Sequence, residues 1–62
     1  MNYLNVTKIH LLSCGWIPVD TGTIKEVMIE TGNSYKFSAL EFCSEGKKIV
    51  CQFSFVVAMK FE

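Results

Sequence analysis

The feature that most constrains the fold is a strict alternation of side chains in the last third of the chain. From Ile49 to Phe61 every second residue is apolar, while the residues between them are polar at Gln52 and Ser54 and apolar again at Val56. A period of two places successive side chains on opposite faces of a β-strand, and the Phe and Val content favours the same conformation. The pattern predicts a long C-terminal strand with one face in the core and the other partly covered.

The length of this strand is a geometric problem for so short a chain. Thirteen residues in strand geometry span about 43 Å at roughly 3.3 Å each. A compact chain of 62 residues has a radius of gyration near 11 Å and is about 28 Å across. The strand must therefore bend sharply, as in a small SH3-like barrel, or extend into another subunit. Because no glycine lies between Ile49 and Phe61, we favour oligomerisation, with bending as the alternative.

Two turns divide the preceding segment into further strands. Residues 44–48, Ser-Glu-Gly-Lys-Lys, predict a hairpin turn, so residues 35–43 should pair antiparallel with the last strand. The alternation within 35–43 changes phase between Ala39 and Leu40, and a bulge there would bring both apolar sets to one face. Residues 31–34 form the second turn, in which Gly32 and Asn33 would supply the unusual φ values.

Two segments fit either a strand or a helix. Thr23 and Glu26 are spaced as a capping box, but the β-branched residues that follow favour a strand. Residues 4–13 are equally divided between the two conformations. We therefore predict a mainly β fold, either a small antiparallel meander or an SH3-like open barrel with a long C-terminal strand. The alternative is an α+β fold with a short helix near residues 5–14 or 23–31.

The length of the chain indicates one small domain spanning residues 1–62. Such a domain buries only about 60% of its unfolded surface. Since 50% of the residues are hydrophobic, we expect apolar side chains at the surface, where they favour a homo-oligomer or another partner. The three cysteines cannot complete a disulfide framework, and neither a signal peptide nor a membrane span is recognisable. A cytoplasmic location with buried free thiols is expected.

No sequence pattern indicates catalysis or a cofactor. Phosphate-binding glycine loops are absent, and the carboxylates occupy positions typical of solvated strands and turns. A Cys–His nucleophile pair would lack an orienting third group. One His and three Cys are formally a structural zinc set, but without the short Cys-x-x-Cys spacing that makes such a signal specific: His10, Cys14, Cys43 and Cys51. We therefore expect no enzymatic activity, no metal site and no cofactor.

Four residues are candidates for binding a ligand or a partner: His10, Trp16, Tyr35 and Lys36. Trp16 is the only tryptophan, and large aromatic side chains anchor interfaces or stack on ligand rings. The alternative is that Trp16 closes one end of the core. Tyr35 and Lys36 place an aromatic ring beside a positive charge, as nucleic-acid-binding barrels do. The net charge of zero argues against binding that depends on phosphates.

These features favour a small non-enzymatic binding or inhibitor protein that acts by stoichiometric contact with a protein partner or a small-molecule ligand. In general character the chain is similar to phage-encoded accessory proteins, including those that block or sequester components of host defence; this resemblance of type covers no specific motif. A ligand such as a nucleotide would sit between subunits of a homo-oligomer, because one domain of this size has little room for a pocket. The alternative is a nucleic-acid-binding small β-barrel. No membrane association is expected.

Overall fold

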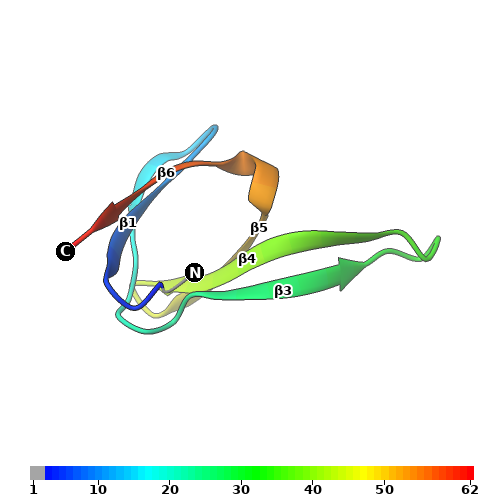
Figure 1. Cartoon of the computed structure of the whole chain (residues 1–62), viewed down its shortest axis with the longest axis horizontal. Coiled ribbons are helices and arrows are strands. Elements are labelled where there is room, and N and C mark those ends of the chain that lie inside the picture. Colours follow the sequence, from blue (N-terminus) through cyan, green and yellow to red (C-terminus); the bar gives the residue numbers. More distant parts are fainter. Residues whose placement is uncertain (1–2) are drawn as a thin grey trace.

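The fold consists of two antiparallel three-stranded sheets joined by a small core (Figure 1). A computed structural model describes residues 3–62. The strands are β1 (Val6–Leu11), β2 (Gly15–Pro18), β3 (Lys25–Glu30), β4 (Lys36–Ser44), β5 (Lys47–Gln52) and β6 (Val56–Phe61), with a short 3₁₀ helix, η1 (Phe53–Phe55), between the last two. Sheet A has the strand order β2-β1-β6 and sheet B the order β3-β4-β5. The predicted mainly β architecture is confirmed in the form of a small meander, and the strands of residues 3–62 close no barrel.

The C-terminal segment forms two strands and not one. β5 ends at Gln52, one turn of 3₁₀ helix follows, and β6 begins at Val56, so the chain crosses from sheet B to sheet A (Figure 1). The prediction of one continuous strand is therefore wrong at residues 53–55, and the alternative of a sharp bend is confirmed. A 3₁₀ turn needs only ordinary helical dihedral angles, and the Val56 N–H bonds to the Phe53 carbonyl, so the bend requires no glycine. Strand length is therefore no longer a reason to expect oligomerisation.

Both segments that could have been helices are strands. The alternative of a short helix near residues 5–14 or 23–31 is wrong, because β1 and β3 occupy these regions. The apolar residues of β1 do not alternate strictly, because the register of β1 against β6 shifts between Val6 and Lys8. This irregularity allows Val6 and Ile9, three positions apart, to be buried in the same core.

β4 is buried on both faces where it crosses the middle of sheet B. Its register against β3 and β5 is continuous, so the predicted bulge at Ala39 and Leu40 is wrong. Leu40 and Phe42 point toward sheet A and pack with Val6 and Ile9 of β1. Ala39 lies on the opposite face of the strand and is also fully buried. The change of phase in the sequence therefore marks a second covered face.

The connection between the two sheets is fastened to the β4–β5 turn. The Asp20 carboxylate accepts hydrogen bonds from the backbone amides of Glu45 (3.1 Å) and Gly46 (2.9 Å). The Thr23 hydroxyl donates to the Asp20 carbonyl (2.8 Å) and accepts from the Cys43 amide (3.0 Å). Glu45 and Gly46 have φ of 51° and 82°, as in the tight hairpin turns that glycine favours, which confirms the predicted turn at residues 44–48.

The β3–β4 hairpin extends beyond the rest of the molecule. β5 pairs with β4 only from Ala39 to Ser44, so residues 28–38, here called the arm, are only two strands wide and project from the body (Figure 1). The arm contributes to the elongated dimensions of 38 × 23 × 22 Å. Its turn confirms the second predicted turn at residues 31–34, but the positive φ of 63° occurs at Ser34 and not at Gly32 or Asn33.

Candidate binding surfaces

Each sheet has an inner face in the shared core and an outer face that points away from it. The inner faces contribute Val6, Ile9 and Leu11 from sheet A and Leu40 and Phe42 from sheet B. Because side chains alternate along a strand, the neighbours of these residues define the outer faces. The outer face of sheet B is here called the apolar face, and that of sheet A the basic face.

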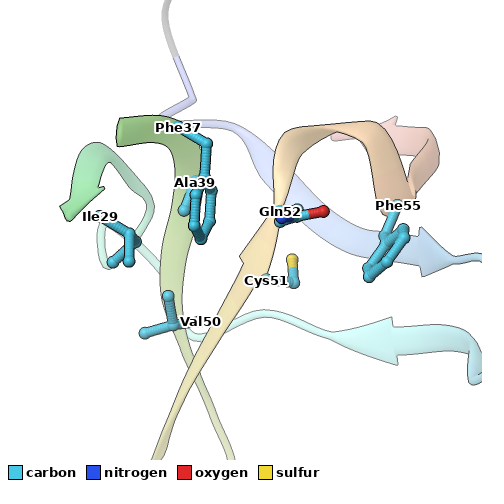
Figure 2. Close-up of a pocket in the computed structure, with 7 residues that line it drawn as sticks. All are labelled: Ile29, Phe37, Ala39, Val50, Cys51, Gln52 and Phe55. Carbon is cyan, nitrogen blue, oxygen red and sulfur yellow. The ribbon is translucent and has the colours of Figure 1, made fainter. Parts of the chain in front are cut away.

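The apolar face contains an open groove of about 360 Å³. Figure 2 shows side chains from three strands and from η1 around it, with Phe55 across the groove from the β4 side chains. Val50 and Phe55 are each 48% exposed, and Gln52 brings an amide to an otherwise apolar lining. The lining residues are Ile29, Phe37, Ala39, Val50, Cys51, Gln52 and Phe55.

The end of the apolar face nearest the β4–β5 turn is polar. Glu41, opposite Val50 in the register, has carboxylate oxygens 3.0 Å from Lys48 Nζ and 3.5 Å from Lys25 Nζ. The hydrogen bond from Lys48, helped by the Lys25 charge and partly opposed by desolvation, lowers the pKa of Glu41 below its ordinary value. The three side chains form a compact ionic cluster, so the apolar surface continues from Val50 toward the arm and not toward the turn.

The basic face is centred on Trp16. This residue lies directly opposite His10 in the β1–β2 register, and the two rings stack with centroids 5.1 Å apart at an angle of 29°. Lys60 Nζ lies 4.9 Å from the centre of the indole, within the range of a cation–π interaction. Trp16 is 43% exposed and does not belong to the core cluster, so the alternative that it closes one end of the core is wrong.

The charges of sheet A are all of one sign. The charged residues of its strands are Lys8 and Lys60, and these strands contain no Asp or Glu. The strands of sheet B carry lysines and glutamates together. The net charge of zero is thus an average over two dissimilar surfaces, and it does not exclude a basic surface on one of them.

The four predicted site residues do not form one site. His10 and Trp16 are in contact on the basic face, whereas Tyr35 and Lys36 lie in the arm of sheet B. The Tyr35 ring instead packs on Phe37, with centroids 6.1 Å apart. Lys60 was not predicted as a site residue; the alternation places it on a more polar face of the last segment, but only the pairing of β6 with β1 brings it to Trp16.

The three thiols lie in different parts of the fold, Cys14 between β1 and β2, Cys43 in β4 and Cys51 in β5. Within residues 3–62 no three His, Cys, Asp or Glu side chains lie close enough together to hold a metal ion. All three cysteines are free, and Cys14 is exposed, so the expectation of buried thiols fails for it. Cys43 and Cys51 do not face each other across the hairpin, because they pair with Lys48 and Leu40. Burial, together with Cys14, raises the pKa of the Cys51 thiol and makes it a poorer nucleophile.

Comparison of the chain with protein-family models, with curated proteins and with solved structures finds no match. In the part of the chain that the structure describes, no helix has the length and apolar character needed to cross a membrane.

Proposed function

We propose that this protein is a small non-enzymatic binding protein that acts by stoichiometric contact, with the apolar face as its docking surface and a second copy of the chain as the first occupant. The groove with half-exposed Val50 and Phe55 is the observation that supports this proposal. Exposed apolar surface costs about 25 cal/mol per Å² in water. An open groove lined mainly by hydrophobic and aromatic side chains, with a polar group among them, is the usual form of a binding site.

A second copy suits this surface for two reasons. A two-fold interface places the same patch against itself, and the apolar face offers both an apolar region and an ionic cluster with charges of both signs. A second copy packed on the arm would also stabilise it, because an isolated two-stranded hairpin is marginally stable in water. Tyr35 in the arm is exposed and packs on Phe37, which lines the groove, and small domains commonly rely on oligomerisation for stability.

The dimer would then be the unit that acts on a further partner. Blocking or sequestering a component of host defence, as phage-type accessory proteins do, requires contact and no catalytic group. The groove lining is apolar apart from Gln52, which suits aliphatic and aromatic side chains of a protein better than a nucleotide. A cytoplasmic location belongs to the same proposal, because the three free thiols persist in a reducing compartment.

The test is native mass spectrometry of the protein purified from its own host, with sedimentation at micromolar concentration. We expect the wild-type chain to be a dimer and Val50→Lys to be a monomer. Val57→Lys is the matched control, since Val57 is exposed to a similar extent but lies in β6; it should remain dimeric. A wild-type chain that is monomeric at these concentrations would contradict the proposal.

A further inference from the structure

The exposed indole of Trp16 is presented on a rigid part of the molecule. Trp16 lies in the edge strand β2, but its indole is held by ring contacts with the neighbouring strands: His10 of β1 stacks on it, and Lys60 of β6 lies over the ring. A ring that is already ordered loses little conformational entropy when another ring stacks on it. Stacking a nucleobase on an aromatic side chain is favourable for every base, because each base has a π-face.

The positions of the two lysines near Trp16 lower the stability of the sheet. Lys8 and Lys60 are directly opposite each other on neighbouring strands, and like charges in this position destabilise a sheet. Neither lysine has an ion pair within residues 3–62. The Asp20 carboxylate accepts from two backbone amides of the β4–β5 turn. Glu62, whose backbone amide bonds to the Asn5 carbonyl beyond the end of β6, makes no ion pair with either lysine in the described residues. An anion that neutralises this pair would relieve the repulsion.

We propose that the basic face binds single-stranded nucleic acid: a base stacks on the exposed indole of Trp16 and displaces the Lys60 ammonium from its position over the ring, so that Lys60 and Lys8 contact phosphates. Charge complementarity selects this occupant, because the strands of sheet A carry cations and no carboxylate. The same base-and-phosphate chemistry occurs in a free nucleotide. However, small-molecule sites bury most of their ligand, whereas the basic face is the outer surface of a sheet. A strand offers several phosphates and needs no enclosure.

The experiment uses the fluorescence of Trp16, the only tryptophan of the chain. Titration with a short oligothymidylate in 50 mM salt should quench this emission. With two phosphate contacts, the affinity should fall by about sevenfold between 50 and 200 mM salt. Binding of a labelled strand, followed by anisotropy, should weaken about three- to tenfold in Lys8→Gln and in Lys60→Gln, and about fivefold or more in Trp16→Leu.

Lys36→Gln is the matched control, because it removes one lysine from the arm of sheet B, and its affinity should equal that of the wild type. Val50→Lys should also bind the strand, which separates this proposal from the dimer on the apolar face. An unquenched Trp16 at 50 mM salt would overturn the proposal, as would an equal loss of affinity in Lys36→Gln. Polyphosphate that binds as tightly as the oligonucleotide would also overturn the proposal. Adenosine monophosphate that binds with the same affinity as the strand would overturn it too. Circular dichroism of each variant verifies the fold.

Discussion

The two sheets share one core and one architecture, yet their outer faces have opposite chemistry. Sheet A presents a single stacked tryptophan among cations, and sheet B presents an apolar groove that ends at a mixed ionic cluster. Both inner faces are built from the same kinds of apolar residue. The difference teaches that in so small a domain the inner faces form the core, while the outer faces, which within residues 3–62 only η1 covers in part on sheet B, leave side chains exposed for contact with other molecules.

The largest effect on stability should come from a substitution in the core that the two sheets share. Phe42 of β4 is fully buried in the core that also contains Ile9 of β1. Phe42→Ala should lower the free energy of unfolding by about 3–5 kcal/mol, a large share of the 5–15 kcal/mol typical of a domain. Urea denaturation measures this loss, and both outer faces should lose their binding together.

Phe61→Ala is the control for this prediction, because Phe61 is 55% exposed at the end of β6. It should change the free energy of unfolding by less than about 1 kcal/mol. If Phe42→Ala were as stable as Phe61→Ala, the two sheets would not depend on a common core.

A smaller effect should follow from releasing the connection between the sheets. Asp20→Ala removes both hydrogen bonds to the β4–β5 turn and should cost about 1–2 kcal/mol, because water can reach the freed amides. Asp20→Asn retains one acceptor oxygen and should lose about half as much. Thermal and urea denaturation report both variants. Equal stability of Asp20→Ala and the wild type would mean that the turn is held by β4 and β5 alone.

Most of the secondary structure could be predicted from the sequence, because alternation and turn residues are local signals. The turn at Glu45 and Gly46 and the strands around it follow from these signals. The bend at residues 53–55 could not be predicted, since it depends on pairing β6 with β1, more than forty residues earlier in the chain. Propensity alone favoured a continuous strand in this segment, and the tertiary pairing overrode it.

The candidate sites were only half predictable for a related reason. His10 and Trp16 are close in sequence and pair across one hairpin, so their joint role is local. Lys60 reaches the same ring from the other end of the chain, and nothing in the sequence indicates that register. The aromatic–basic pair of Tyr35 and Lys36 was a reasonable motif, but it lies in the arm, away from the cations of sheet A.

A second comparison lies within sheet B, between the arm and the part of β4 that has a strand on both sides. Residues 28–38 are two strands wide, whereas residues 39–44 of β4 have partners on both sides. In monomeric Val50→Lys, hydrogen-bonded amides of the arm should exchange with solvent at least about tenfold faster than those of residues 39–44. If the wild type forms the proposed dimer, this difference should shrink in it, because the second copy would cover the arm. Uniform exchange along β4 in the monomer would contradict this view of the arm.

The smallest effect concerns the ionic cluster that ends the apolar face. Lys48, together with Lys25, lowers the pKa of Glu41 in the folded chain. A carboxyl whose folded-state pKa is depressed contributes stability above its unfolded-state pKa, and this contribution is lost as the pH falls through the folded-state value. The wild type should therefore lose slightly more stability than Glu41→Gln when the pH is lowered from 6 to about 3. The effect is small because both lysines are exposed to solvent and salt.

The contribution of the ionic cluster to the pH dependence of stability can be distinguished from general destabilisation by acid when variants are compared at low and high salt. Lys48→Gln removes the largest cause of the shift and should flatten the pH dependence almost as much as Glu41→Gln, whereas Glu30→Gln in β3 should leave it as in the wild type. Added salt should weaken the wild-type dependence, since exposed charges are screened. If Lys48→Gln kept the full pH dependence in urea denaturation, Glu41 would owe its lowered pKa to another partner, and the polar boundary of the apolar face would have to be redrawn without Lys48.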